Sequence, residues 1–447
     1  AGAPPPGSAA RWGRRHGDLP RHGLSLAAAG RGVGDDWEPF GLRGNMRNRP
    51  VLPYFETVSR RDRSQDKSRL GRYEDYLEAD HCLRVAQTAS FECPGVSLLA
   101  GRAQRGEDTM VSFQSGFADL ATQVPVTPDT IFRIFSLTKP IVAASLLPLV
   151  ERGEVSLLSA IDRWLPEFGK EHLRVWDGER LVPATRSITL LDVLRHTSGM
   201  FYPGNPANGT PGVEDATLCD AFLNAGVRQA SSHTEMAKRL AQVPLAHEPG
   251  ERFTYSPATA LIPLIVEKAS GMPYERYLQD VLFRPLGMCD TGFYIRKASQ
   301  RQRLANLYVR GPRDADGRWT FTEAERKIFT YEKGAPLNGD GGLFSTIGDF
   351  GRFVRFLLCE GPKVVDTTTL VNFFRPQLEP AGLHMPKDFL GFDADFGLGA
   401  YVHQQRICGW SGLANTHFWC DRYSGQYVIL MAQTFPFSWR YQQLLTD

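Results

Sequence analysis

The sequence lacks the usual marks of metal-dependent, cofactor-dependent and disulfide-rich proteins. Its seven cysteines are scattered, odd in number and free of any Cys-x-x-Cys pair, which argues against a disulfide scaffold or a zinc site. The ten histidines form no His-x-x-x-His pattern, and the chain contains neither Gly-x-Gly-x-x-Gly nor a phosphate-binding loop. The sequence therefore predicts no metal and no cofactor.

The chain also lacks a strong charge of either sign and a long apolar run. A formal net charge of +2 over 447 residues is too small to indicate binding to nucleic acid or to an acidic membrane surface. No apolar stretch is long enough to span a bilayer. With 42% hydrophobic and 22% charged residues, the composition is typical of a soluble globular protein.

The N-terminal segment 1–68 differs in composition from the rest. Its first fifty or so residues have no lysine, and Asp18 is the only acidic residue before Asp35. They contain a triple proline, eight arginines and an Ala/Gly-rich run, which together cannot build a hydrophobic core. The segment is compatible either with an organellar targeting sequence or with a disordered tail.

Strand patterns occur near both ends of the remaining chain, and helical patterns lie between them. We expect helices at 69–90, 141–150, 190–196, 259–270 and 345–358, and strands at 95–100, 110–114, 131–134, 396–401, 416–420 and 427–433. This order predicts an α+β fold, an α/β-α sandwich in which helices flank an antiparallel sheet. The sheet domain would comprise 69–155 and 326–447, with 156–325 as a mainly helical insertion.

The most informative stretch is Ser136-Leu137-Thr138-Lys139-Pro140. In a helix, a serine and a lysine three residues apart lie on one face, one turn apart. Pro140 fits best in a first helical turn, so Ser136 and Lys139 would lie at the positive end of the helix dipole. That position favours a serine alkoxide and disfavours a lysine cation, as a serine nucleophile with a lysine base requires.

The surroundings of this motif decide between two interpretations. By itself, Ser-x-x-Lys also occurs in a capped helix with a surface lysine. Here, however, Ile141 to Val150 is apolar on nearly every face, which predicts a buried helix. A lysine at the start of a buried helix requires a functional or structural reason.

Two further stretches carry groups that such a site could use. Tyr255 precedes the helix at 259–270, and its phenol could relay a proton; the alternative is a core tyrosine. Gly409 to Leu413 precedes a strand, where a backbone N–H could bind an oxyanion; the alternative is a plain turn. Each interpretation depends on the other motifs being present.

As a set, these stretches resemble the serine β-lactamase-related family, on its branch of class C β-lactamases, penicillin-binding proteins and esterases. The resemblance covers about residues 70 to 447, with the motifs in the family's order. The matching stretches are Thr130 to Pro140, Leu194-Arg195-His196-Thr197-Ser198-Gly199, Tyr255-Ser256, Pro285 to Met288, Asp290 to Phe293, Gly341 to Thr346 and Trp410-Ser411-Gly412.

The resemblance implies a β-lactamase/transpeptidase-like fold and a role for each matching residue. Ser136 would be the acylated nucleophile, Lys139 its base partner and Tyr255 the second proton carrier. The backbone N–H groups of Ser136 and Leu413 would form the oxyanion hole. Trp410-Ser411-Gly412 would contact the substrate.

Two departures from the family's β-lactamases bear on the substrate. Those enzymes carry Tyr-x-Asn, whereas the third position here is Pro257, and they begin the third motif with lysine, whereas Trp410 stands here. Both changes remove contacts to an anionic lactam or peptide. The sequence therefore favours a hydrolase of short acyl esters, and the expected partner is a small-molecule ester or amide substrate. The alternatives are a β-lactamase or D-alanyl peptidase, an acyltransferase and a non-catalytic scaffold.

His196, in the His-Thr-Ser-Gly stretch, is expected to fix a loop by a hydrogen bond rather than to take part in catalysis, because the serine already has two partners.

Overall fold

The structure, a computed structural model, describes residues 54–57, 92–104, 107–204, 213–324, 334–358, 364–386 and 389–441. The helix expected at 69–90 and nearly all of the N-terminal segment 1–68 lie outside these ranges.

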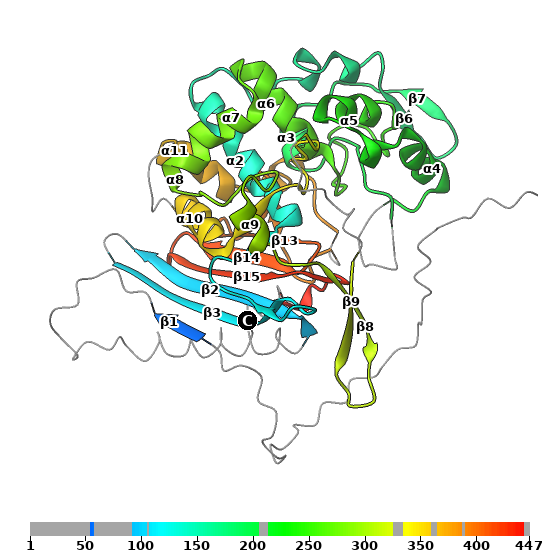
Figure 1. Cartoon of the computed structure of the whole chain (residues 1–447). Helices are drawn as coiled ribbons and strands as arrows, with labels where there is room; N and C mark the ends of the chain where they lie inside the picture. Colours follow the sequence, from blue (N-terminus) through cyan, green and yellow to red (C-terminus); the bar gives the residue numbers. More distant parts are fainter. Residues whose placement is uncertain are drawn as a thin grey trace, which may run out of the picture. The chain divides into compact units, whose positions relative to one another are not determined.

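An antiparallel sheet built from both ends of the chain forms one layer (Figure 1). Its strand order is β1 (Tyr54–Thr57), β3 (Glu107–Asp119), β2 (Gly95–Gln104), β15 (Gln426–Ala432), β14 (Thr416–Asp421), β13 (Ile407–Gly412), β12 (Tyr401–His403) and β11 (Asp395–Phe396), and β4 (Val124–Pro125) pairs with β3. Because β2 pairs with β15, the early and late strands share one sheet. This arrangement confirms the predicted fold class.

Alternation along β2 gives the sheet two apolar faces. Leu99 belongs to the main core, whereas Val96 and Leu98 belong to a smaller cluster with side chains of β15. Helix α10 (Ile347–Leu357) packs on the Leu99 side, where a Cβ at Gly351 would lie 2.6 Å from Leu99 Cδ2. A larger residue at this position would therefore require the Leu99 side chain to move.

Helix α2 (Thr138–Glu151) follows the 3-10 turn η1 (Phe135–Leu137) and is buried from Thr138 to Leu149. Other helical elements lie on the same side of the sheet as α2 (Figure 1). They are η2 (Ile161–Arg163), η3 (Pro166–Phe168), α3 (Leu190–Leu194), α4 (Ala216–Ala225), η5 (Val227–Gln229), α5 (His233–Leu240), η6 (Ala258–Leu261), α6 (Ile262–Ser270), α7 (Tyr274–Leu278), the π-helical η7 (Gln279–Phe283), α8 (Arg284–Leu286), α9 (Ala298–Gln302), α11 (Thr367–Leu370), η8 (Val371–Phe374) and η9 (Glu379–Ala381).

Two boundary predictions were wrong. The single strand expected at 396–401 is a hairpin of β11 and β12, in which Gly399 has a φ of 82° that favours glycine. The helix expected to begin at Ser345 begins at Ile347, because β10 (Phe344–Thr346) pairs with β5 (Ile131–Arg133). Tertiary pairing overrode the helical pattern at this end.

The range 156–325 also contains strands that the sequence did not predict. One hairpin consists of β6 (Arg174–Trp176) and β7 (Leu181–Pro183), and another of β8 (Tyr308–Arg313) and β9 (Trp319–Glu323). Strand β8 also pairs with β16 (Thr434–Phe435). The division at residues 155 and 325 stays a prediction.

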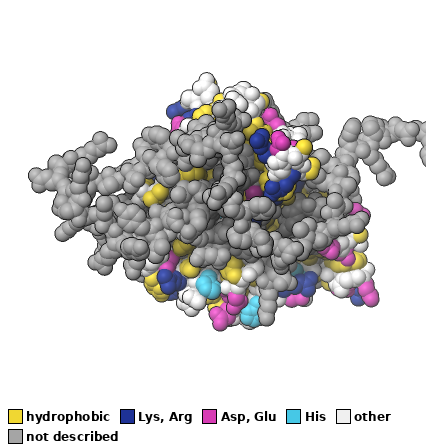
Figure 2. All heavy atoms as spheres, turned by 90° about the horizontal axis from the view of Figure 1, so that it is seen from below, with side chains coloured by type: hydrophobic (Ala, Val, Ile, Leu, Met, Phe, Trp, Pro, Cys, Tyr) yellow, Lys and Arg dark blue, Asp and Glu magenta, His cyan; other side chains and the backbone are white. Residues whose placement is uncertain are grey.

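The distribution of surface charge and the length of the apolar helices bear on binding to nucleic acid and to membranes. Where described side chains are visible in Figure 2, those of both charge signs are interspersed, in keeping with the small net charge. Within the described ranges, no helix combines the length and apolar character needed to cross a membrane.

Candidate active site

Ser136 lies in η1, directly before α2, and Lys139 follows one turn later. The Lys139 Nζ atom lies 3.1 Å from Ser136 Oγ, and the lysine is completely buried. Phe135 adopts a left-handed φ of 47°, which changes the chain direction at the residue before the serine. Local backbone geometry thus brings together the two residues that the motif predicted.

Tyr255 comes to the same serine from 119 residues further along the chain. Its hydroxyl lies 2.9 Å from Ser136 Oγ. The Lys139 Nζ atom also lies 4.7 Å from the centroid of the Tyr255 ring. Ser136, Lys139 and Tyr255 therefore form one contiguous polar cluster, as the sequence predicted, although their chemical roles stay a proposal.

Trp410-Ser411-Gly412 forms the end of strand β13 rather than a turn. The pairing of β13 with β12 ends at Gly409, so these three residues pair only with β14. Their other edge, which has no strand partner among the described residues, faces η1. A Cβ at Gly412 would lie 2.4 Å from the Ile134 carbonyl oxygen, so only glycine allows the strand to approach η1 this closely.

A cavity of about 480 Å³ opens over Ser136. Trp410, Ser411, Leu413 and Tyr255 line it, whereas Gly412 is not among its lining residues. Ser136 and Leu413, whose backbone N–H groups are the predicted oxyanion donors, therefore line one cavity. Further aromatic walls come from distant segments: Tyr202, Phe222, Phe389, Phe437 and Trp439.

Two residues at the site were not among the sequence candidates. Tyr202 donates its hydroxyl to Asp340 Oδ2 (2.6 Å), and Lys139 Nζ donates to the Tyr202 hydroxyl oxygen (3.3 Å) and to the Asp340 carbonyl oxygen (2.7 Å). Tyr202 follows Gly199 of the His-Thr-Ser-Gly stretch by three residues, and Asp340 lies in the glycine-rich entry to β10. The closeness of Tyr202 and Asp340 to these motifs in the sequence was the signal that could have identified them as site residues.

His196 supports the loop that carries Tyr255. Its Nδ1 lies 3.0 Å from Ser256 Oγ, and its ring packs edge-on against the Tyr255 ring at 4.8 Å. The imidazole is completely buried, and burial, together with the charge of Lys139 when that amine is protonated, lowers the pKa of His196 well below the usual value. A neutral ring in this position fits the predicted loop-fixing role.

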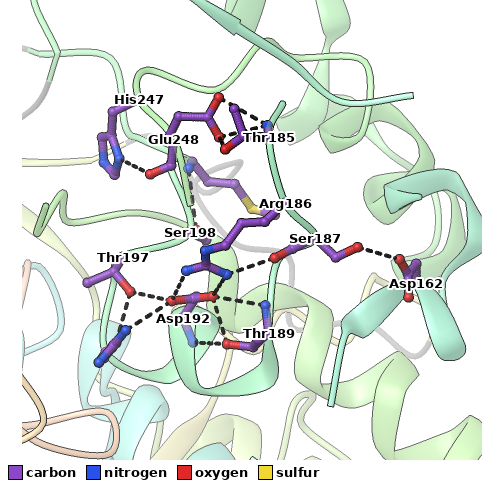
Figure 3. A network of polar contacts seen from close by, with 12 residues as sticks. Asp162, Thr185, Arg186, Ser187, Thr189, Asp192, Thr197, Ser198, His247 and Glu248 are labelled. Atoms are coloured by element: carbon purple, nitrogen blue, oxygen red, sulfur yellow. Dashed lines mark hydrogen bonds and ion pairs between the residues drawn. The ribbon is translucent and has the colours of Figure 1, made fainter. Parts of the chain in front are cut away.

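Asp192 holds α3 and the loop that follows it (Figure 3). Its carboxylate accepts hydrogen bonds from Arg186, Arg195 and Thr197, and it forms a capping box with Thr189 at the start of α3. Burial would raise the pKa of Asp192, but hydrogen bonds, chiefly from Arg186, Thr189 and Thr197, hold it below its usual value.

The comparison with known protein families agrees with these motifs. The sequence model of the family described as Beta-lactamase matches residues 88–445. The chain belongs to this family.

Two curated relatives show how far the sequence similarity extends along the chain. An uncharacterized protein of Mycobacterium tuberculosis is 34% identical over 254 residues, which is 55% of this chain and 58% of the relative. The chain thus matches less than two thirds of that relative's length. Esterase EstB of Burkholderia gladioli is 29% identical over 344 residues, covering 71% of this chain and 81% of the esterase.

Solved structures show that the fold is that of beta-lactamase-like proteins. EstCE1, described as a hydrolase with promiscuous acyltransferase activity, has a TM-score of 0.68 at 21% identity, covering 84% of this chain and 99% of that one. Simvastatin synthase (LovD) of Aspergillus terreus has a TM-score of 0.66 at 23% identity, covering 84% and 97%.

Proposed function

We propose that the chain is a serine hydrolase that cleaves short acyl esters through an acyl-enzyme on Ser136. The observation that carries the proposal is the position of Ser136 Oγ, 3.1 Å from Lys139 Nζ and 2.9 Å from the Tyr255 hydroxyl, at the wall of an apolar cavity. A hydroxyl is a weak nucleophile until an adjacent base takes its proton, and both neighbours can carry protons.

In the proposed reaction, Ser136 Oγ attacks the ester carbonyl carbon while its proton passes to Lys139 Nζ. The carbonyl electron pair moves onto its oxygen, and the backbone N–H groups of Ser136 and Leu413 stabilise that charge. When the carbonyl re-forms, the alcohol leaves with a proton delivered through Tyr255. Water then attacks the acyl-serine by the reverse route and releases the acid.

The character of the cavity supports an ester rather than a lactam. Trp410, at the position of the β-lactamases' lysine, is almost fully buried and packs against Phe389, Phe396 and Tyr255. Pro257 offers no side-chain amide to a substrate. An aromatic wall favours uncharged acyl groups, because burying a charge without a partner is costly.

An acyltransferase differs from this hydrolase only in the acceptor of the acyl group. Monacolin J acid methylbutanoyltransferase of Aspergillus terreus, 28% identical over 263 residues, is one relative whose name describes such a transfer. That match covers 57% of this chain and 59% of the relative. We therefore include an alcohol acceptor in the test rather than propose transfer as the main activity.

The test compares the wild type with Ser136→Ala on p-nitrophenyl acetate and p-nitrophenyl butyrate, with intact-mass detection of an acyl adduct. Ser145→Ala is the matched control, because Ser145 lies in α2 but bonds to Val142 and Tyr274 instead of Lys139. We expect hydrolysis and an adduct in the wild type and in Ser145→Ala, and neither in Ser136→Ala.

Parallel reactions decide between the alternatives. Faster hydrolysis of nitrocefin than of either ester would favour the β-lactamase alternative. Formation of a butyl ester in added 1-butanol, at the expense of free acid, would favour the acyltransferase. Equal inactivity of folded wild type and Ser136→Ala would contradict the proposal and favour the scaffold.

A further inference from the structure

Among the described residues, three oxygens lie within hydrogen-bonding distance of Lys139 Nζ, one from the adjoining turn and two from distant segments. They are Ser136 Oγ at 3.1 Å, the Tyr202 hydroxyl oxygen at 3.3 Å and the Asp340 carbonyl oxygen at 2.7 Å. Lys139 is fully buried, and Asp340 is only 6% exposed. The direction of the proton in each contact therefore depends on the protein and not on bulk water.

The hydroxyl proton of Tyr202 is donated to Asp340 and not to Lys139. A phenol has one O–H, and the Tyr202 hydroxyl donates to Asp340 Oδ2 at 2.6 Å. Its oxygen can therefore only accept a hydrogen bond from Lys139. The Asp340 carbonyl oxygen can likewise only accept. Two of the three neighbours of the amine are thus fixed as acceptors.

We propose that Asp340, acting through Tyr202, is a positioning residue that directs the lone pair of the Lys139 amine at Ser136 Oγ. This inference rests on the proposed function. A neutral amine has two N–H bonds and one lone pair. If the two N–H bonds go to Tyr202 and to the Asp340 carbonyl, the lone pair faces Ser136, from which it takes the proton.

Burial and the charge of Asp340 keep the Tyr202 hydroxyl protonated and donating to Asp340. Burial raises the pKa of Tyr202 well above its usual value, and the Asp340 carboxylate raises it further, so the phenol keeps its proton. Without that carboxylate, the Tyr202 hydroxyl could turn and donate to the lone pair of Lys139. The amine would then be blocked as a base for Ser136.

The experiment is a double-mutant cycle with Asp340→Ala and Tyr202→Phe, read as kcat and KM on p-nitrophenyl butyrate. Asp340→Ala keeps the backbone carbonyl and removes only the carboxylate. We expect kcat to fall about 10- to 100-fold in each single variant, which is part of the roughly 10²- to 10⁴-fold that a general base contributes, with KM within about twofold. Because Asp340 acts through Tyr202, the double variant should match Tyr202→Phe.

Two further variants separate positioning from general structural damage. Asp340→Asn keeps an acceptor oxygen for the Tyr202 hydroxyl and should restore most of the activity that Asp340→Ala loses. Tyr274→Phe is the matched control, because it removes another buried tyrosine hydroxyl, one that contacts Ser145 of the same helix, α2. It should leave kcat unchanged, and thermal melts confirm that each variant is folded.

The outcomes also distinguish this inference from the proposed function. If Ser136→Ala is inactive while Asp340→Ala retains the wild-type kcat, only the positioning role is wrong. Independent, multiplicative losses from Asp340→Ala and Tyr202→Phe would overturn it as well, because the carboxylate would then act by another route. Activity that survives Ser136→Ala would instead contradict the proposed function.

Discussion

The backbone N–H of Thr254 donates to the carbonyl oxygen of His196 at 2.8 Å. This bond joins the loop after α3 to the segment that holds Tyr255 against Ser136. His196 has a left-handed φ of 58°, so its carbonyl direction depends on contacts that hold the loop in this conformation. The network around Asp192 supplies contacts of that kind (Figure 3).

Asp192→Asn should lower the free energy of unfolding by about 3 kcal/mol, because it leaves Arg186 and Arg195 without their carboxylate partner in a largely buried position. Urea unfolding at neutral pH measures the change. Asp177→Asn, in an exposed turn, is the control and should change stability little. A change at Asp192 no larger than the change at Asp177 would contradict a supporting role for the network.

His196 should make the fold sensitive to mild acid. Because burial and Lys139 lower its pKa in the folded state, the unfolded chain binds a proton more readily. The stability contributed by the neutral ring is thus fully present above about pH 6.5, the usual histidine pKa, and is lost as the pH falls below that value.

The measurement is urea unfolding of the wild type and of His196→Asn at several pH values from about 7.5 to 5.5. The loss of stability toward acid should be smaller in the variant. His172→Asn, at an exposed position, should retain the wild-type slope. If the wild type and His196→Asn show the same slope, the buried imidazole does not cause the acid sensitivity.

Gly412→Ala should damage catalysis. The new Cβ would lie 2.2 Å from Thr416 Oγ1 and 2.4 Å from the Ile134 carbonyl oxygen, so β13 must move away from η1. On the proposed mechanism, this movement separates the N–H groups of Ser136 and Leu413, and kcat should fall about 100-fold.

Steady-state kinetics on p-nitrophenyl butyrate tests this prediction. Gly348→Ala is the matched control, since its Cβ would have its nearest contact at 3.7 Å, with Arg352. Wild-type kcat in Gly412→Ala would mean that the close contact between β13 and η1 is not needed for turnover.

The aromatic cavity should favour butyrate over acetate. Each buried methylene contributes about 0.8 kcal/mol, so two methylenes should raise kcat/KM by about 15-fold. Trp439→Ala removes one wall, which packs against Phe389, Phe437 and Trp410, and should reduce this preference.

Initial rates on a series of p-nitrophenyl esters measure the preference. Trp164→Ala removes a half-buried indole that does not line the cavity and should keep the wild-type preference. An unchanged preference in Trp439→Ala would exclude this wall from acyl recognition.

Local patterns predicted some elements well. Strand β2 and the buried helix α2 were foreseen because alternation and apolar runs are properties of neighbouring residues. The hairpin of β11 and β12 was not foreseen, because its two short strands and glycine turn have the composition of one strand. The strand β10 was missed because its partner β5 is distant in sequence.

The sequence by itself determined the family, the motif order and the pairing of Ser136 with Lys139, since a three-residue spacing places both side chains on one turn. Only the tertiary structure decided which groups surround that pair. Tyr202 and Asp340 are 138 residues apart, and their contact results from chain packing that no local pattern encodes. The orientation of the lysine amine depends on such long-range contacts, because each acceptor comes from a different segment.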